Sequence, residues 1–519
     1  MFKNFGVKNL LPIITLATLL ISYALLLAHP INLVTADLGR HIKNGEIIWN
    51  EQFNVLKTNF YSYTHPNFPT TNHHWLSGLV FYGLWKLVGF KGIHIFFILI
   101  SLATLFIFFR IATTKSSPAI VALVALPLLP ILLERDEIRP EIFSYLLASI
   151  FFWLILKIKN GQANPKYLFI LPVLQIVWTN LHIYFFLGPV ILGTFLIEAL
   201  IEKNSLLKKK LSLTFLLSII ATAITPFGIN STLAPLTIFK NFGYRLAENQ
   251  SVWFIEKILP NPNYLIFKII FLVLILSLIA RIWRLKSYKT LITDIVFTLG
   301  FSIAGWFAIR NFAIFGLFAL PLIASNLANL FNSKPEAPRW LDRTVLATLI
   351  LTVLIILSGE FRTIYPKAQK LGLGLENGNT TALDFFKENN LTGPIFNNYD
   401  IGGYLIFGFE NYPEQNRRVF TDNRPEAYPA EFFEKTLIPM QEDKEIWDEK
   451  NSLYKFNAII FSYRDYTPWG QAFFARILND PEWKTVFADN RVIILLKNNE
   501  LNKNIIAKYG QSLKIKVAN

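Results

Sequence analysis

The stretch LLPIITLATLLISYALLLA at residues 10–28 contains no charged side chain, and as a helix it is long enough to cross the hydrocarbon core of a membrane. Ten further apolar runs follow it. The eleven runs together are residues 10–28, 92–111, 118–133, 142–156, 168–178, 184–201, 211–224, 264–280, 291–309, 312–330 and 344–357. We therefore expect a multi-span α-helical membrane protein with about 11 spans.

The composition agrees with lipid as the main solvent. Of 519 residues, 53% are hydrophobic and 16% are charged, which is too apolar for a soluble globular chain. Cysteine is absent, so disulfides and thiolate metal sites are excluded. The net charge of +15 comes from Lys and Arg gathered between the apolar runs, so it indicates topology and predicts no nucleic-acid partner. No small-residue cleavage motif follows residues 10–28. We therefore interpret this stretch as a signal anchor that is retained in the protein.

The stretch at residues 74–90 decides the topology. It is apolar, contains Lys86 and includes Gly89, and at roughly 15 residues it is short for a span, so we expect it to lie in the membrane interface. All basic loops then fall on one side. They carry Lys3, Lys8, Arg110, Lys115, Lys157, Lys159, Lys166, Lys203, Lys208, Lys209, Lys210, Arg281, Arg284, Lys286, Lys289, Lys334, Arg339 and Arg343. By the positive-inside rule, this is a multi-pass protein of the inner (cytoplasmic) membrane with a cytoplasmic N-terminus and an extracytoplasmic C-terminus.

The composition becomes mixed after residue 357, which predicts a water-soluble domain. Strand-like and helix-like segments alternate there, as in an α/β fold. The predicted strands are residues 394–397, 418–421, 458–463, 485–488 and 492–496, and the predicted helices are residues 381–389, 429–441, 444–455 and 469–478. The last two strands should form a hairpin. We expect a transmembrane domain at 1–358, with interfacial helices in an outer loop at 29–91, and a C-terminal extracytoplasmic α/β domain at 359–519.

Polar side chains gather at the outer ends of the predicted spans, where ionisable groups are costly and typical of function. Asp37 follows the first span on a stretch that suits an amphipathic interfacial helix. A partly desolvated carboxylate there can act as a general base toward a hydroxyl, so Asp37 is the candidate catalytic residue. The candidate donor- or acceptor-binding residues are Arg40, His41, His73, His74, Arg135, Asp136, Arg139, Glu141, Asn180, His182, Arg310 and Asn311.

Arg139, Arg310 and His182 are the candidates for holding a phosphate, because a guanidinium can donate paired hydrogen bonds to its oxygens. A structural interpretation stays open for each candidate. Asp37 can cap a helix or pair with an arginine. The charged residues at 134–141 can neutralise one another.

The remaining candidates also have structural interpretations. Asn180 and His182 can cap a short span, and Arg310 can belong to a tight turn. His73 and His74 lack a third ligand at metal-binding spacing, so we predict no metal site. A divalent cation stays an open alternative, and no other cofactor is indicated.

Two polar stretches in the soluble domain follow predicted strands. Residues 397–404 contain Gly402 and Gly403, which permit a close backbone approach, but the pattern is not a dinucleotide-binding motif. Residues 421–424 end a predicted strand, where open α/β sheets bind ligands. A structural turn network is the alternative interpretation of residues 421–424.

This arrangement resembles the GT-C superfamily of polyprenyl-phosphate-sugar-dependent glycosyltransferases, such as protein O-mannosyltransferases, the lipid A aminoarabinose transferase and the galacturonosyltransferases of lipopolysaccharide core. Within the superfamily, it is similar to a large bacterial subgroup. The resemblance covers nearly the whole chain and is carried by residues 37–45, 72–76, 139–141, 180–182, 225–228, 310–311, 398–400, 402–404 and 418–422.

The resemblance implies that Asp37 matches the catalytic base of the first outer loop and that residues 74–90 match a juxtamembrane helix. The acidic pair usual at that loop is absent, because Leu38 follows Asp37. We expect an inverting transfer of a sugar from a polyprenyl-phosphate donor, with membrane lipid as a further partner, to an acceptor that the sequence leaves unknown. The alternatives are a transporter or flippase of a lipid-linked glycan and a non-catalytic glycan-binding scaffold.

Overall fold

The computed structural model describes residues 7–202, 205–237, 240–286, 288, 291–330, 338–365, 369–409 and 418–510. Four lysines of the predicted basic loops lie outside the described residues, namely Lys3, Lys203, Lys289 and Lys334. The chain forms two compact units, described separately below. The bundle unit comprises Met1–Pro30, His94–Phe239 and Leu246–Gly374, and the sheet unit comprises Ile31–Ile93, Lys240–Arg245 and Leu375–Asn519.

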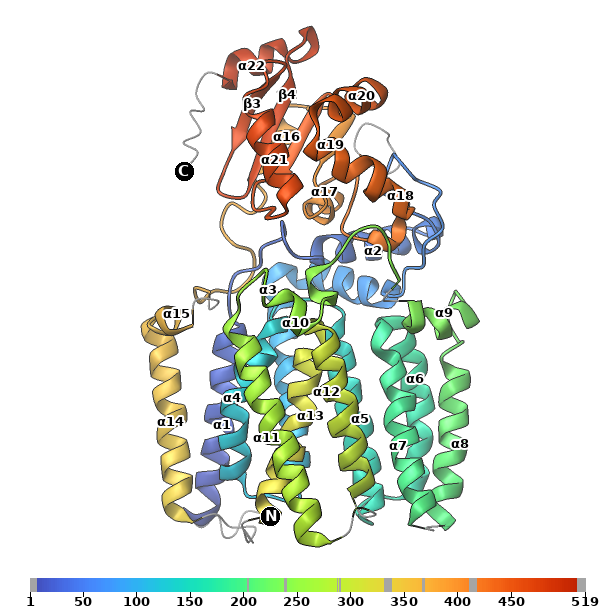
Figure 1. Cartoon of the computed structure of the whole chain (residues 1–519), viewed down its shortest axis with the longest axis vertical. Helices are drawn as coiled ribbons and strands as arrows, with labels where there is room; N and C mark the ends of the chain where they lie inside the picture. The colour runs from blue at the N-terminus through green and yellow to red at the C-terminus, as the bar shows by residue number, and fades with distance from the viewer. Residues whose placement is uncertain are drawn as a thin grey trace. The chain divides into compact units, whose positions relative to one another are not determined.

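Long helices running side by side form the bundle unit (Figure 1). They are α1 (Val7–Leu27), α4 (Pro118–Leu132), α5 (Glu141–Lys159), α6 (Ile170–Leu181), α7 (Leu187–Ile201), α8 (Ser205–Ala221), α11 (Pro262–Leu285), α12 (Ile292–Phe307), α13 (Phe312–Leu330) and α14 (Arg339–Ser358). Short helices connect them. They are η2 (Leu133–Arg135), η3 (Pro165–Phe169), η4 (Ile183–Phe186), α9 (Ile229–Leu233), η5 (Ala234–Thr237), η6 (Ala247–Asn249), α10 (Val252–Ile255), η8 (Ile309–Asn311) and α15 (Phe361–Ile364).

Each of the eleven predicted apolar runs contains a helix. Within the described ranges, eight helices are long and apolar enough to cross a membrane. The other three runs contain α6, α8 and α12, which have 12, 17 and 16 residues. A helix of that length spans less than the hydrocarbon thickness unless the adjoining turns complete the crossing.

The helices differ in how much of their surface the protein covers. In the helical segment Ile309–Leu330, which contains α13, 83% of the 18-residue apolar window (the stretch long enough to cross a membrane) is buried. There, Phe318 stacks on Phe301 of α12 with ring centroids 3.9 Å apart. In α14, only 17% of that window is buried. The apolar side chains of α14 therefore face the surroundings of the bundle unit, as expected of a helix in contact with lipid.

The helix α3 (Trp75–Ala112) is broken at Gly89, whose φ of 63° lies in the left-handed region that glycine tolerates. The break separates residues 75–88, within the predicted interfacial stretch, from the predicted span that follows. Leu87 and Val88 are 82% and 55% exposed before the break. Exposed apolar side chains suit an interfacial helix, and the position of residues 75–88 in the interface stays a prediction.

The sheet unit contains a four-stranded sheet with the order β1-β2-β4-β3. The strands are β1 (Ile395–Asn397), β2 (Ala458–Ser462), β3 (Trp483–Ala488) and β4 (Val492–Lys497). β1 pairs with β2 in parallel, whereas β4 is antiparallel to both β2 and β3. The predicted closing hairpin is confirmed as β3 and β4, which gives a mixed α/β sheet.

Helices surround this sheet and build the rest of the sheet unit. They are α2 (Leu38–Trp49), η1 (Phe53–Leu56), α16 (Thr381–Glu388), α17 (Gly402–Gly408), η10 (Pro425–Ala427), α18 (Ala430–Phe432), η11 (Phe433–Leu437), α19 (Ile438–Glu442), α20 (Lys444–Tyr454), α21 (Pro468–Ile477), η12 (Glu500–Asn502) and α22 (Lys503–Tyr509). The predicted helix at 429–441 is thus three consecutive segments, the middle one a π-helix.

The predicted strand at residues 418–421 is wrong. Val419 forms an isolated bridge with Ser62, and the backbone N–H of Phe420 donates to the side-chain oxygen of Asn397 at 2.9 Å. The segment therefore satisfies its backbone through the first outer loop and a side-chain amide instead of a ladder in the sheet. Alternating apolar residues cannot distinguish these two outcomes.

Candidate functional site

Asp37 lies at the N-terminal end of α2, in the sheet unit. Its side chain makes no capping hydrogen bond to the helix. Instead, the side-chain amide of Asn423 donates to Asp37 Oδ1, and an Arg40 guanidinium nitrogen lies 3.6 Å from the same oxygen. Arg40 Nε also donates to Asn423 Oδ1 at 3.1 Å. These three residues, which we call the Asp37 site, orient a carboxylate with one neutral donor and one cation.

Two glycines let the Asn423 turn approach α17. A Cβ on Gly402 would lie 2.4 Å from Asp422 Cα, and a Cβ on Gly403 would lie 3.3 Å from the Asn423 amide nitrogen. The first distance is shorter than any real contact, so glycine is needed at residue 402. This is the close backbone approach that the sequence predicted, and it brings a turn of the C-terminal part to the Asp37 site.

Buried polar contacts also hold the turn at residues 421–424. Asp422 is fully buried and accepts two hydrogen bonds from Arg424, each at 2.7 Å. Arg424 also donates to Asn59 at 2.9 Å, and Tyr428 donates to Asp422 at 3.1 Å. Residues 421–424 therefore form the structural network that was one of the two predicted interpretations, and Asn423 projects from it toward Asp37.

Asp400 adds a second carboxyl group to the electrostatics of the sheet unit. Burial, together with the negative charges of Asp465 and Asp37, raises the pKa of Asp400 to about 7. A carboxyl group with such a pKa changes its charge near neutral pH. The sequence carried the signal in the polar stretch 397–404, but spacing alone does not reveal a shifted pKa.

The predicted histidines pack against one another. His41 of α2 contacts His74 edge to face, with ring centroids 5.5 Å apart, and His74 contacts His73 at 6.0 Å. Burial lowers the pKa of His73 to about 4, so this imidazole is neutral at physiological pH. Within the described part of the chain, no three His, Asp or Glu side chains lie close enough together to bind a metal ion. Arg40 also places a positive charge beside Asp37. This positive charge disfavours the binding of a divalent cation at Asp37.

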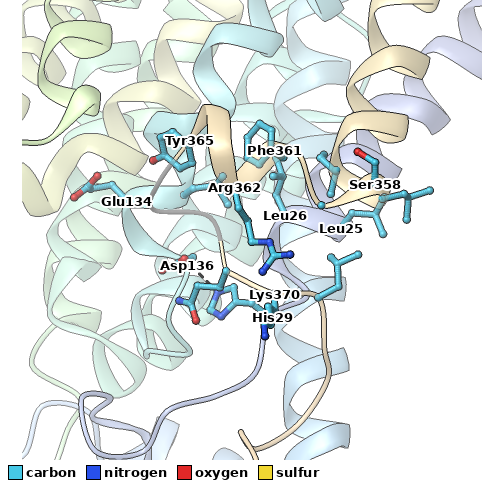
Figure 2. Close-up of a pocket in the computed structure, with 16 residues that line it drawn as sticks. Leu25, Leu26, His29, Glu134, Asp136, Ser358, Phe361, Arg362, Tyr365 and Lys370 are labelled. Atoms are coloured by element: carbon cyan, nitrogen blue, oxygen red, sulfur yellow. Dashed lines mark ion pairs between the residues drawn. The ribbon is translucent and has the colours of Figure 1, made fainter. Parts of the chain in front are cut away.

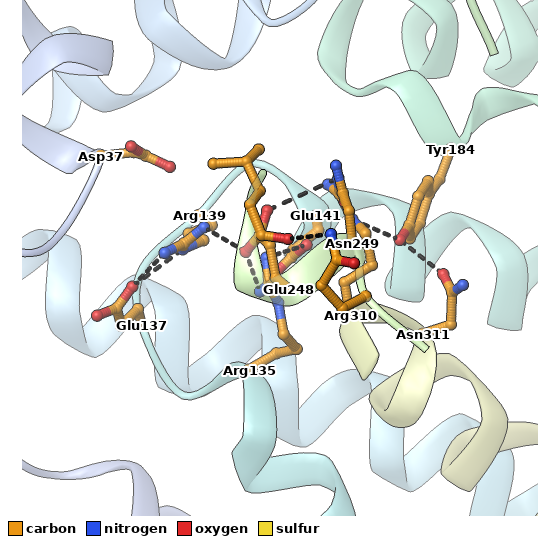
Figure 3. Close-up of polar contacts among 12 residues, drawn as sticks. Asp37, Arg135, Glu137, Arg139, Glu141, Tyr184, Glu248, Asn249, Arg310 and Asn311 are labelled. Atoms are coloured by element: carbon orange, nitrogen blue, oxygen red, sulfur yellow. Dashed lines mark hydrogen bonds and ion pairs between the residues drawn. The ribbon is translucent and has the colours of Figure 1, made fainter. Parts of the chain in front are cut away.

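A second group of polar contacts lies in the bundle unit and is formed by Arg135, Arg139 and Arg310 with their glutamate partners (Figure 3). We call it the arginine cluster. Arg135 binds Glu141 through two nitrogens, and both side chains are buried, at 7% and 3% exposure. Glu248 of η6 accepts from Arg135 at 2.6 Å and from Arg139 at 3.1 Å. Burial raises the pKa of Glu248, but the arginines of the cluster outweigh it and hold the pKa well below its ordinary range. Arg139 also pairs with Glu137 at 2.6 Å.

Arg310 joins the arginine cluster through neutral partners. It donates to the Tyr184 hydroxyl at 3.1 Å and to Asn249 at 2.9 Å, and it lies 3.7 Å from Glu248. Tyr184 in turn donates to Asn311 at 2.8 Å. The structure therefore brings Arg135, Arg139, Glu141, Arg310 and Asn311 into one network. Glu137, Glu248 and Tyr184 complete it. Glu137 belongs to the charged stretch 134–141, whereas Tyr184 was not among the candidates.

Two of the remaining candidates lie apart from direct contact with that network. Asp136 is 3.2 Å from His29, away from the partners of its neighbour Arg135. Asn180 donates to the backbone oxygens of Ile176 and Ile224, as a capping residue does.

His182 contacts both Ser144 and Tyr184. Its Nδ1 lies 2.8 Å from Ser144 Oγ, and its ring contacts Tyr184 with centroids 4.8 Å apart. It therefore reaches the arginine cluster through an aromatic contact with Tyr184. Its role in binding phosphate stays a prediction.

Comparisons with known proteins identify the fold. No protein-family model and no curated protein matches this sequence. Among solved structures, the chain is similar to the archaeal oligosaccharyltransferase AglB from Archaeoglobus fulgidus in complex with an inhibitory peptide and a dolichol-phosphate. The TM-score is 0.57 and the identity 10%, with coverage of 94% of this chain and 74% of that chain. The chain is thus a multi-pass membrane protein whose fold is similar to that of this oligosaccharyltransferase.

Proposed function

We propose that this protein is an inverting membrane glycosyltransferase that moves a sugar from a polyprenyl-phosphate donor to an extracytoplasmic acceptor. The observation that supports this most strongly is the Asp37 site, in which a carboxylate on the first loop of a GT-C-like fold is held by Asn423 and Arg40. A carboxylate with a fixed orientation is suited to receive a proton from a hydroxyl.

The proposed reaction is a single displacement. The acceptor hydroxyl oxygen attacks the anomeric carbon of the sugar while Asp37 takes the hydroxyl proton. The bond between that carbon and the phosphate oxygen breaks, and its electron pair remains on the departing lipid phosphate. Attack on the face opposite the leaving group inverts the anomeric configuration.

We assign stabilisation of the departing phosphate to Arg139 and Arg310. Arg310 supports this role better, because it donates hydrogen bonds to neutral oxygens of Tyr184 and Asn249. Arg139 is paired with Glu137 and Glu248, so a phosphate would have to replace a carboxylate. A cation that holds the developing charge lowers the barrier of the displacement.

Transfer of label tests the proposal. The purified full chain would be incubated with a polyprenyl-phosphate donor labelled in its sugar and with cell-envelope extracts as acceptors. We expect label to leave the lipid, and Asp37→Asn to stop this. Asp384→Asn is the matched control, because Asp384 is an exposed carboxylate on α16 of the same unit. Label that stays on the lipid but crosses the bilayer of proteoliposomes would instead establish transport.

We also propose the inner membrane as the location, with the N-terminus cytoplasmic and the sheet unit outside. The cysteine-free sequence makes this simple to test with introduced thiols. Tyr466 is 81% exposed in the sheet unit, and Lys115 is exposed after α3. A membrane-impermeant maleimide should label Tyr466→Cys from outside the inner membrane, and Lys115→Cys only after that membrane is permeabilised. The reverse pattern would contradict the orientation.

A further inference from the structure

A cavity of about 450 Å³ lies in the bundle unit where α1, η2, α14 and α15 end (Figure 2). We call it the His29 cavity. Its polar lining is formed by His29, Glu134, Asp136, Ser358, Arg362, Tyr365, Gln369 and Lys370. Its apolar lining is formed by Leu25, Leu26, Leu133, Ile356, Leu357, Phe361 and Leu371. Arg135 of the arginine cluster does not line it, so the cavity and the cluster are different places.

The carboxylates of the His29 cavity already have partners. Asp136 lies 3.2 Å from His29 Nε2. Burial lowers the pKa of His29, but the hydrogen bond to Asp136 and its negative charge outweigh burial and raise the pKa above its ordinary value. Glu134 accepts hydrogen bonds from the side-chain amides of Asn261, at 3.0 and 3.1 Å, and of Asn263, at 2.5 Å.

Two cations remain in the lining. Arg362 and Lys370 line the cavity, and both residues are exposed. In Figure 2, the Arg362 side chain points toward the region of His29 and Lys370. A phosphate between the two cations would receive charged hydrogen bonds, with a guanidinium on one side and an ammonium on the other.

The apolar lining continues onto the surface of the two helices that the protein covers least. Only 28% of the apolar window of α1 and 17% of that of α14 are buried. Leu357 and Leu371, both in the lining, are 55% and 44% exposed. A hydrocarbon chain that leaves the cavity along these leucines would stay in contact with apolar surface.

We propose that the His29 cavity binds the phosphate head group of an anionic lipid, with Arg362 and Lys370 as its cationic ligands and the hydrocarbon chain along α1 and α14. This site is additional to the arginine cluster and does not depend on the proposed transferase reaction. The lipid is either an anionic membrane phospholipid or a polyprenyl phosphate, because both carry an anionic phosphate group attached to hydrocarbon.

Native mass spectrometry of the full chain can test this with three probes: phosphatidylglycerol, phosphatidylcholine and a polyprenyl phosphate. We expect Arg362→Gln/Lys370→Gln to weaken binding of at least one anionic probe by about tenfold or more, since two charged contacts are lost. The matched control is Arg339→Gln/Arg343→Gln, which removes the same charge from exposed residues at the opposite end of α14. This control should change binding by less than about twofold.

The outcomes separate the sources of the lipid. Loss of phosphatidylglycerol alone identifies a membrane phospholipid, and loss of the polyprenyl phosphate alone identifies the carrier. Equal losses in the control variant, or no loss in Arg362→Gln/Lys370→Gln, would overturn the proposal. Both variants change exposed residues, so each should keep the melting temperature of the parent protein, which shows that its fold is intact. The binding measurement involves no turnover, so a failed transferase assay leaves its result unaffected.

Discussion

The Asp37 site and the arginine cluster differ in the partners of their charged side chains. In the sheet unit, the Asp37 carboxylate is held by an amide and lies 3.6 Å from one guanidinium nitrogen. In the bundle unit, each of the three arginines of the cluster lies within ion-pair distance of at least one glutamate. The difference indicates that the Arg135–Glu141 pair of the cluster holds the ends of helices together, whereas the Asp37 site keeps a carboxylate oriented for chemistry.

Among changes to the residues that hold Asp37 and Glu141, the largest expected effect is on activity when Asn423 is removed. Asn423→Ala should lower kcat by about 10- to 100-fold while KM stays within about twofold, because the base loses its orientation and substrate contacts are untouched. Steady-state rates over a range of donor concentrations would show this. An increase in KM with unchanged kcat would place Asn423 in binding instead.

Asn423→Asp sharpens the same point with nearly unchanged shape. A second carboxylate beside Asp37 disfavours its ionised form, so the acidic limb of the pH–rate profile should move up by about one pH unit. Activity would be lost at low pH and recovered as the pH rises. A residue with a purely structural role would lower the rate equally at every pH.

In the arginine cluster, the expected effect is on stability. Arg135→Gln leaves Glu141 buried without its bidentate partner, which should destabilise the fold by about 3–5 kcal/mol. Thermal unfolding in detergent would measure this as a lower melting temperature. A stability close to that of the parent protein would show that Glu141 finds another partner, and the structural interpretation of the cluster would be lost.

Asp400 should make the sheet unit respond to pH. Its folded pKa of about 7 lies above the ordinary value of 3.8, so the folded state holds a proton that the unfolded state releases. Stability should fall as the pH rises from about 4 to about 7 and then level off. Protein atoms crowd the carboxyl group, but the residue is also accessible to solvent, which reduces the effect to about 1–2 kcal/mol. Asp400→Asn should flatten this part of a plot of melting temperature against pH.

The smallest effect is expected at an exposed ion pair that serves as a reference. The Lys444 and Asp448 side chains on α20 are 2.5 Å apart and 61% and 52% exposed. Lys444→Gln should leave the melting temperature almost unchanged, because water and salt screen such pairs. A loss comparable to that of Arg135→Gln would mean that burial does not explain the difference.

Much of this fold could be predicted from the sequence, because apolar length and charge between runs are local signals. The helices in the eleven apolar runs and the final hairpin of the sheet unit follow from such signals. The break at Gly89 lies within the stretch that the sequence marked as too short to span. The strand predicted at residues 418–421 was wrong, because its backbone partners come from distant segments.

The partners of the candidate site could not be predicted in the same way. Asn423 lies 386 residues from Asp37 in the sequence, and Glu248 lies 113 residues from Arg135. Such contacts depend on which loops the fold brings together. The sequence could identify Asp37 and the arginines by their positions at span ends, but not the amide and the carboxylates that hold them.

The central claim is that Asp37 is the base of a sugar transfer, and single-turnover kinetics test it most directly. Protein saturated with a polyprenyl-phosphate sugar would be mixed with acceptor, and donor occupancy and transfer rate would be measured in the same sample. We predict that Asp37→Asn keeps the donor bound and transfers its sugar about 10²- to 10⁴-fold more slowly. A transfer rate equal to that of the parent protein, at full donor occupancy, would contradict the account.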